Sequence, residues 1–393
     1  MSHRTAVLAV ALSLLTAPAL ANERLKLDWN LRLRHEYVDD AAFNRDANAD
    51  TLRLRASILA ALGPDWSLLV EGESIAAAGN DYNSGANARS GWPVITDPTG
   101  AELNQAWLGW KGAHAAATIG RQRIQLDNQR FVGNSGWRQN EQTFDALSFE
   151  ATPIDGLTLR YSWLDRVHRV SGDNALDPRA RERDLSTHLI NAAFKRGAQQ
   201  WVAYAYLHDD HDVASASTAS YGMRWSGSHP LAAITWGWTA ELAHQTDYSD
   251  NPLHFAHQYW LLEPSMQVHG ITWRLGWEHL GGNGLHALQT PLATLHAFNG
   301  WADKFPVTPP GGIEDVYLAA SGKVHTATWT VAAHDFRADE GGQHYGREWN
   351  LSLAAPVHAG WNGLIKLADY RSDGFARDTR KLWVQLEYTG SRP

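Results

Sequence analysis

The sequence contains no cysteine, and beyond residue 21 it has no run of about 18 apolar residues. The first absence excludes disulfides and cysteine-based metal sites, and the second excludes helical membrane spans. Charged residues are scarce at 19%, and 42 acidic residues outnumber 34 basic ones. Because nucleic-acid binding needs a basic surface, this balance argues against a nucleic-acid partner. One membrane architecture is still open, since its strands are only half apolar.

The first 21 residues have the composition of an export signal. Arg4 is the positive residue of the n-region, residues 6–15 are a short apolar core, and Ala19-Leu20-Ala21 is a small-x-small cleavage site. An N-terminal membrane anchor is the alternative, but the apolar core is too short to span a bilayer. We therefore predict a signal peptide over 1–21 and a mature domain over 22–393.

Apolar and polar residues alternate along the mature chain, which is the period of a strand with one apolar and one polar face. In the first segment the apolar set is Leu25, Leu27, Trp29, Leu31, Leu33 and Tyr37. We count 18 such segments, near residues 25–38, 50–62, 66–75, 102–111, 115–126, 143–152, 157–169, 187–195, 199–208, 217–226, 231–245, 256–263, 269–280, 313–320, 323–336, 345–354, 362–370 and 379–388.

Short and long connections alternate between these segments. The short ones include 63–66, 111–115, 152–156, 196–199, 226–230 and 321–323. Tight turns at one end and long loops at the other are typical of an up-and-down barrel in a bacterial outer membrane. A soluble sandwich or propeller also alternates, but its strands are shorter. We predict an all-β, antiparallel transmembrane barrel of about 18 strands, with lipid outside and an aqueous lumen inside.

The strand pattern places many basic side chains on the inner face of this barrel. They include Arg32, Arg34, Arg53, Arg55, Arg121, Arg123, Arg160 and Arg274. Arginine rings or ladders select anions in pores, so the cluster favours contact with an anionic solute. Inward Arg and Glu residues that pair across neighbouring strands, and so stiffen the wall, would produce the same pattern. Trp107 and Trp383 also face inward and offer flat surfaces on which sugar rings stack.

No motif in the sequence indicates catalysis or a cofactor. The 19 histidines form no HExxH arrangement, and no nucleophile elbow is present. His208 and His211 lie with three aspartates in HDDHD, which could hold a divalent cation but is more typical of a solvated loop. We therefore assign no catalytic residue, no metal ligand and no cofactor.

Two stretches carry a family resemblance. LNQAWLGW and TIGRQRIQLDNQRFVGNSGWRQNEQTFDAL lie within 103–147, and LQTPLATLHAFNGWADKFPVTPPGGIEDVYL covers 288–318. Together they resemble the alginate export family of outer-membrane barrels. The resemblance implies an 18-stranded barrel that passes an anionic polyuronate outward through an arginine-rich lumen. By position it assigns to the solute path Arg121, Arg123, Arg130 and Asp145 from the first stretch, Asp303 and Lys304 from the second, and Arg53 and Arg55 from the second strand.

Two features bear on how far the resemblance extends. The stretch 288–318 either packs on the barrel mouth or folds inward as a constriction. The chain ends on Tyr388-Thr-Gly-Ser-Arg-Pro instead of a terminal aromatic residue, which a tail beyond the last strand would explain.

The leading functional hypothesis is a channel for an anionic polysaccharide, such as an alginate-like polyuronate, or an acidic oligosaccharide, with periplasmic secretion components as further partners. The alternatives are a porin for small anionic solutes and, in another class, an outer-membrane hydrolase.

Overall fold

The computed structural model describes residues 24–393, which fold into one antiparallel sheet of 18 strands. The strands are β1 Leu25–Asp40, β2 Ala47–Ala61, β3 Trp66–Asp81, β4 Gly100–Lys111, β5 Ala115–Gln122, β6 Thr143–Ile154, β7 Leu157–His168, β8 Glu182–Arg196, β9 Gln199–His208, β10 Thr218–Leu231, β11 Ile234–Asp247, β12 Ala256–Val268, β13 Ile271–Leu280, β14 Ile313–Val324, β15 Ala327–Arg337, β16 His344–His358, β17 Trp361–Ser372 and β18 Thr379–Arg392. The connections contain three helical turns, α2 Pro178–Arg181, η1 Ala214–Ala216 and η2 Leu295–Ala297. None of the helices in the described part is long and apolar enough to cross a membrane. The predicted signal peptide lies outside the described residues.

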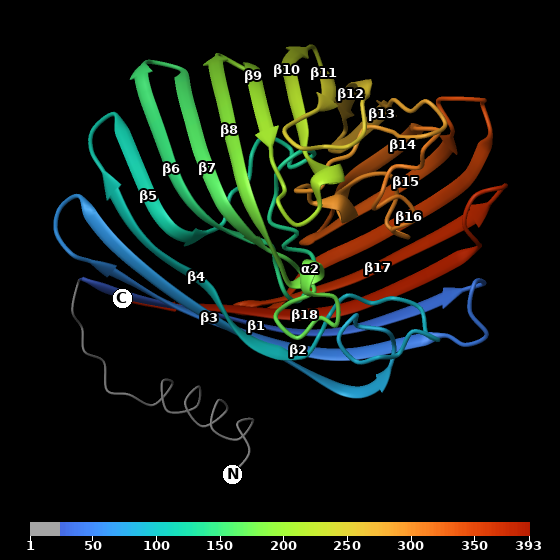
Figure 1. The fold of residues 1–393 in the computed structure, drawn as a ribbon, viewed down its shortest axis with the longest axis horizontal. Helices are drawn as coiled ribbons and strands as arrows, with labels where there is room; N and C mark the ends of the chain where they lie inside the picture. The colour runs from blue at the N-terminus through green and yellow to red at the C-terminus, as the bar shows by residue number, and fades with distance from the viewer. Residues whose placement is uncertain (1–23) are drawn as a thin grey trace.

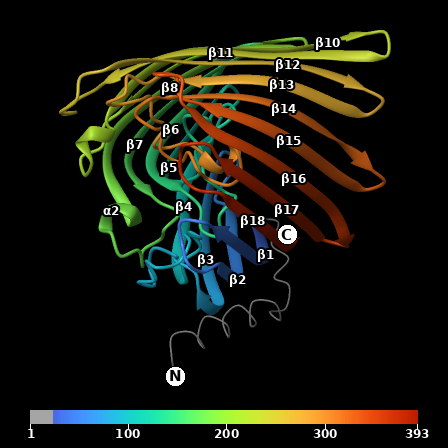
Figure 2. The ribbon, with the colours of Figure 1, turned by 90° about the vertical axis from the view of Figure 1, so that its right-hand side faces the viewer.

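The sheet closes on itself because β1 pairs with both β2 and β18. The closing register runs from Leu27 opposite Arg392 to Asp40 opposite Thr379. Each further strand pairs antiparallel with its neighbours in sequence, so that the strands surround a central space (Figures 1 and 2). The all-β barrel predicted from the alternation is therefore confirmed, with the predicted number of strands.

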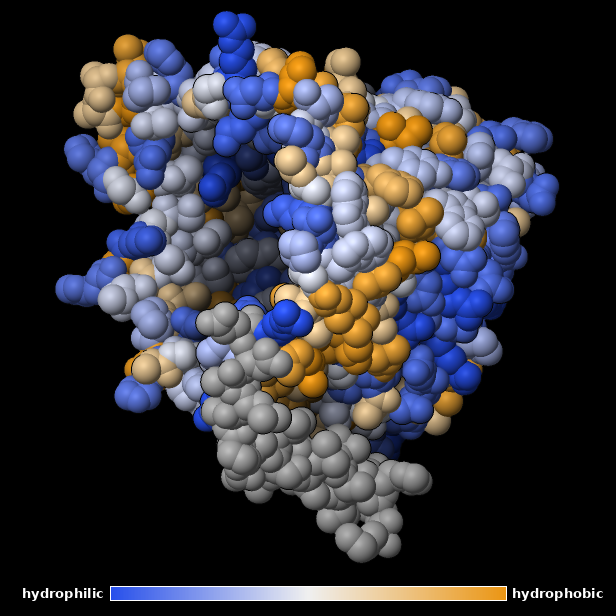
Figure 3. Space-filling view, turned by 90° about the vertical axis from the view of Figure 1, so that its left-hand side faces the viewer, coloured by the Kyte–Doolittle hydropathy of each residue, from blue (hydrophilic) through white to orange (hydrophobic). Residues whose placement is uncertain are grey.

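Alternation along each strand separates an apolar outer face from an inner face. Leu275 and Leu318 are cross-strand neighbours, and their side chains are 54% and 51% exposed. Glu278 and Asp315, on the opposite face of the same two strands, are only 3% and 1% exposed. Large apolar side chains left uncovered in this way on nearly every strand fit a surface that meets lipid. Figure 3 shows one side of the molecule, where polar side chains border a hollow and an apolar patch lies on the adjacent wall.

The connections also alternate as predicted, but two of the predicted turns are misplaced. The segment 226–230 belongs to β10, and the hairpin turns at residues 232–233, where Ala232 adopts a positive φ of 54°. The segment 321–323 belongs to β14, and the turn falls at residues 325–326, with His325 at a φ of 54°. In both cases we placed the turn at Ser and Gly residues, with Pro230 as well in the first, and these residue types are frequent in turns. The strand pairing continues past these residues to a two-residue turn.

The C-terminal residues are part of the sheet. Thr389 to Arg392 continue β18 and pair with the start of β1, from Asn30 back to Leu27. A tail beyond the last strand is therefore the wrong explanation for the missing terminal aromatic residue. These last residues lengthen the seam that closes the barrel.

We predict that Leu275→Arg destabilises the barrel by about 2–4 kcal/mol, which is the cost of an arginine on the lipid face near the middle of a strand. The free energy of unfolding in lipid vesicles, measured by urea titration, tests this prediction. Leu285→Arg is the matched control, because Leu285 lies in a long connection and is 80% exposed. Equal effects of the two substitutions would contradict a lipid-facing role for Leu275.

Candidate functional site

Two of the long connections fold into the barrel lumen and meet there. The first inner loop is residues 123–142, between β5 and β6, and the second inner loop is residues 281–312, between β13 and β14. The backbone N–H of Gly133 donates to the carbonyl of Leu292 at 2.9 Å, and Thr294 N–H donates to Gln129 at 3.0 Å. Figure 1 shows both segments within the ring of strands, in blue-green and in orange. Of the two arrangements open for 288–318, the structure shows the inward one.

Apolar side chains of the inner loops pack against aromatic residues of the barrel wall. Phe131 lies in the first inner loop, and its ring centroid is 5.3 Å from that of Tyr204 and 5.4 Å from that of Tyr259. Val132 and Leu292, which form a bridge between the two loops, are 1% and 4% exposed. Part of the inner wall is therefore dry, whereas the alternation alone predicted an inner face in contact with water. The loops supply the apolar cover that these lumen-facing tyrosines require.

Three of the predicted arginines hold the backbone of the first inner loop. Arg32 donates to the carbonyl oxygen of Gly136 at 3.2 Å, Arg34 to that of Trp137 at 2.6 Å, and Arg53 to that of Gln139 at 3.3 Å. These arginines are 9%, 2% and 1% exposed, respectively. Their side chains are therefore covered by the loop. Each also has a carboxylate partner, since Arg32 and Arg53 pair with Glu387 of β18 and Arg34 lies 3.6 Å from Asp97.

Arg55 and Arg123 converge on one carboxylate of the same loop. Glu141 lies 3.3 Å from the Nη1 atom of Arg55 and 2.5 Å from the Nε atom of Arg123. Glu71 and Glu73 of β3 also pair with these two arginines. For Arg55 and Arg123 the structure thus shows carboxylate pairing that reaches from the wall into the lumen.

The other predicted residues lie at several separate places. Arg121 pairs with Asp145 on the neighbouring strand at 2.9 Å. Arg160 pairs with Glu150 at 2.7 Å, and these two side chains are 40% and 45% exposed. Among residues 24–393, no carboxylate lies within 4.0 Å of the guanidinium of Arg274, which donates to Ser321 at 3.4 Å.

Arg130 links the first inner loop to the second and to the wall. Its Nε atom lies 2.9 Å from the carboxylate of Glu278 on β13, and it donates from Nη2 to Asn299 of the second loop at 3.0 Å. Asn299 in turn donates to Glu278 at 2.8 Å. All three residues are buried. A charge pair this deep is strongly sensitive to the loss of one partner, since the other charge is then left uncompensated.

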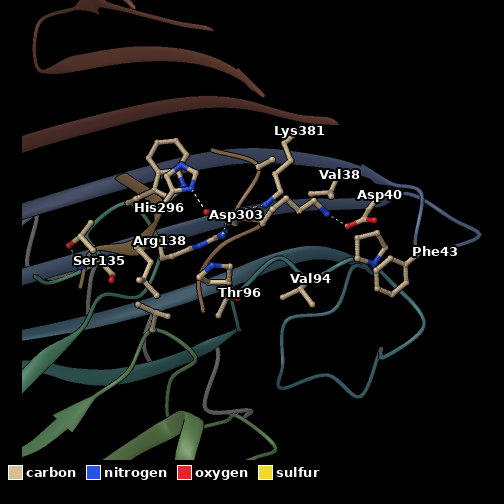
Figure 4. A pocket seen from close by; sticks show the side chains of 18 residues that line it. Val38, Asp40, Phe43, Val94, Thr96, Ser135, Arg138, His296, Asp303 and Lys381 are labelled. Atoms are coloured by element: carbon tan, nitrogen blue, oxygen red, sulfur yellow. Dashed lines mark hydrogen bonds and ion pairs between the residues drawn. The ribbon is translucent and has the colours of Figure 1, made fainter. Parts of the chain in front are cut away.

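A recess of about 430 Å³ lies beside the inner loops, at the end of the barrel that carries the long connections. Figure 4 shows its charged side chains. Lys304 donates to Asp40 at 2.7 Å, and Lys381 donates to Asp303 at 2.8 Å. Arg138 also donates to Asp303, at 3.0 Å. The recess therefore brings together three cations, and each of them already has a carboxylate partner.

An aromatic wall with a neutral histidine closes the inner side of the recess. The rings of Trp137 and His296 are stacked, with centroids 4.7 Å apart. Burial lowers the pKa of His296 to about 3, so the imidazole is neutral near pH 7. Its Nδ1 atom lies 2.7 Å from Asp303, and its Nε2 atom lies 2.7 Å from the Nζ atom of Lys366. The neutral ring can donate to Asp303 and accept from Lys366 at once, and it thereby ties the second inner loop to the wall.

The HDDHD segment is held by protein partners. Asp210 pairs with Arg183 at 2.9 Å and accepts from the backbone N–H of Val213 at 2.8 Å. The imidazole Nδ1 of His208 lies 3.0 Å from the hydroxyl of Thr187. Among the described residues, the one histidine–carboxylate group with the spacing of metal ligands lies elsewhere, at His279, Glu314 and Asp339. Sequence reasoning missed it, because its members come from three separate segments.

We predict that Arg130→Met lowers the free energy of unfolding by about 3–5 kcal/mol, because Glu278 then keeps a buried charge without its cation. Denaturant titration in lipid vesicles measures the change. The double variant with Glu278→Gln removes that charge and retains an acceptor oxygen, so it should recover at least half of the loss. A double variant that is as unstable as the sum of the single variants would show that the two residues do not act as a pair.

Comparisons with known proteins agree with this architecture. OccAB2 of Acinetobacter baumannii is 12% identical with a TM-score of 0.77, over 96% of this chain and 100% of that chain. OpdK of Pseudomonas aeruginosa, solved with vanillate, is 15% identical with a TM-score of 0.74, over 94% and 99% of the two chains. OccK9 (OpdG) of P. aeruginosa is 15% identical with a TM-score of 0.74, over 94% of this chain and 99% of that chain. At these identities the likeness shows the fold, which is that of an outer-membrane barrel.

No curated protein matches the chain. The alginate export family matches residues 23–247, which include the first stretch of the resemblance and leave 288–318 outside the match. The family is described as one of alginate export, and OpdK as an outer membrane protein. Because the match covers more than half of the sequence, this chain belongs to the alginate export family of outer-membrane barrels.

Proposed function

We propose that this barrel lets small carboxylate-bearing solutes cross the bacterial outer membrane, and that they enter through the recess beside the two inner loops. The single observation that carries the proposal is the size and lining of that recess. Its volume of about 430 Å³ lies within the roughly 300–1,000 Å³ usual for small-molecule sites. The long connections face the outside of the cell in barrels of this type, so the recess would be the outer entrance.

The lining of the recess suits an anion with a flat apolar body. Lys304, Lys381 and Arg138 offer donors to a carboxylate, and Trp137 offers an aromatic wall. Each cation is already paired with Asp40 or Asp303, so a solute has to compete for it. Weak binding is what passage requires, because a solute that binds tightly does not leave.

Beyond the inner loops, the next contacts would be arginines on the inner wall. The side chains of Arg121 and Arg123 are 23% and 30% exposed, and that of Arg160 is 40% exposed. A solute that passes the inner loops would leave its contact with one of these paired arginines and form a contact with the next. OpdK, whose structure was solved with vanillate, has the same fold, and vanillate is an aromatic carboxylate. That likeness supports the chemical class of the solute.

A polyuronate is the second candidate, and the family match is the observation that favours it. A polymer has to thread through the lumen, so both inner loops would have to move aside. The contacts that hold them, such as Arg130–Glu278 and Arg34–Trp137, weigh against this movement. Periplasmic secretion components would be partners in this case alone.

Single-channel recordings in planar bilayers separate the two candidates. We expect benzoate to block the current. At the same concentration benzyl alcohol, the neutral molecule of similar shape, should leave the current unchanged. We expect a polyuronate to block no better, per uronate unit, than free glucuronate. A polyuronate that blocks at far lower unit concentration than the monomer would favour the polymer and contradict our assignment.

We predict that Lys304→Gln weakens the block by benzoate about threefold to fivefold, as expected for a partly screened charge contact of about 1 kcal/mol. Lys195→Gln is the control, because it removes the same charge from an exposed residue at the short-turn end of β8. The bilayer recording with benzoate in the chamber on the long-loop side measures both variants. An unchanged block in Lys304→Gln would remove the recess from the solute path.

A further inference from the structure

A histidine and two carboxylates converge at the outer rim of the barrel. His279 lies near the end of β13, Glu314 near the start of β14, and Asp339 in the connection that follows β15. The Nδ1 atom of His279 is 3.7 Å from a carboxylate oxygen of Glu314 and 3.8 Å from one of Asp339. The three ligand atoms all lie within 4.8 Å of one another.

The imidazole of His279 is buried, and its Nδ1 atom has no hydrogen-bond partner. The side chain is 4% exposed, and Nδ1 is a buried polar atom that makes no hydrogen bond. A buried donor or acceptor without a hydrogen-bond partner lowers the stability of a protein by about 1–3 kcal/mol. The Nδ1 atom faces the two carboxylates, whose side chains are 33% and 31% exposed. A ligand could therefore reach the group from the solvent side and satisfy the nitrogen.

The surrounding residues fix the geometry of the group. The ring of Trp260 stacks on His279 with centroids 3.4 Å apart and planes 2° from parallel. The backbone N–H of Gly282 donates to Oδ2 of Asp339 at 3.1 Å, which leaves Oδ1 facing the histidine. Glu314 is paired directly opposite His279 in the β13–β14 ladder. Outer contacts of this kind orient metal ligands in proteins.

The charges around the group also favour a cation. Within residues 24–393, neither Glu314 nor Asp339 lies within 4.0 Å of a lysine or arginine nitrogen, and His279 is the partner of both. Most carboxylates on the inner wall, by contrast, have an arginine partner, as Glu241 and Glu278 do. Two carboxylates that share one histidine therefore leave a local excess of negative charge.

The ligand types and spacing indicate which cation fits. Ligand atoms about 2.0–2.2 Å from a tetrahedral zinc ion lie roughly 3.3–3.6 Å apart, close to the observed 3.7 Å and 3.8 Å. One imidazole nitrogen with two carboxylate oxygens suits zinc or a similar transition metal, whereas calcium and magnesium prefer oxygen ligands alone. A fourth position is left for water.

We infer that His279, Glu314 and Asp339 form a binding site for a divalent transition metal of the zinc type, which clamps both stems of the second inner loop. His279 and Glu314 are each separated from that loop by a single strand residue, while Asp339 belongs to the next connection. Trp277 lies two residues before His279 and Val316 lies two residues after Glu314, so each is on the same face as its neighbour, and both are exposed on the outer wall. The site therefore lies on the outside of the barrel and is separate from the recess.

Isothermal titration of the chelator-treated, detergent-purified barrel with zinc chloride tests the inference. We expect one zinc ion per chain at this site, and a loss of affinity of at least about tenfold in His279→Gln, Glu314→Gln and Asp339→Asn. His254→Gln is the matched control, since His254 pairs with one carboxylate only, that of Asp247 at 3.2 Å. It should leave the affinity unchanged.

A second measurement keeps the test independent of folding. Hydrogen exchange of the second inner loop in wild type should slow when zinc is added, and this change should be absent in Glu314→Gln. Heat-modifiable migration in gels shows that each variant retains a closed barrel. A wild-type chain that binds no zinc, or zinc binding that is equal in all three variants and the control, would overturn the assignment.

Discussion

The constraint on which this structure depends is that lipid cannot hydrogen-bond a peptide group. Each strand must therefore pair on both sides, and the seam between β1 and β18 completes the ring. Once the ring is closed, every side chain of a strand points either outward or inward, as the exposed Leu275 and the buried Glu278 show on β13. The same extended strands whose pairing satisfies the backbone hydrogen bonds also alternate their side chains, and this brings the polar residues of all strands to one shared interior.

A barrel of this size has more interior than its wall side chains can fill, and the two inner loops occupy much of that space. Burying an arginine in such a filled interior costs several kcal/mol unless an acceptor meets it. Arg34 and Arg53 meet loop carbonyls, and Arg55 meets the carboxylate of Glu141. The cost of desolvation thus decides what these charges do in the structure, which is to hold the loops in place.

The strands could be predicted from the sequence because alternation and turn residues are local signals. The errors at 226–230 and 321–323 arose where Gly, Ser and Pro lie inside a strand and the actual turn is at Ala232 or His325. The inner-loop contacts were beyond such reasoning. Arg130 was singled out by family resemblance, but nothing local to it indicates Glu278, which is far away in the chain and is brought near only by the closed sheet. The rim group of His279, Glu314 and Asp339 was missed for the same reason.

The way in which the cations are paired matters more for a channel than their number. A cation such as Arg34 is covered by a loop and held by a carbonyl, so it exerts little electrostatic attraction on a passing solute. Lys304 beside Asp40 keeps a partner that can be exchanged, and Arg274 has no carboxylate within reach in the described part of the chain. Solved barrels at 12–15% identity share the fold of this one. Because these loops decide which inward charges stay available, selectivity should follow loop sequence and contacts more closely than a count of inward arginines.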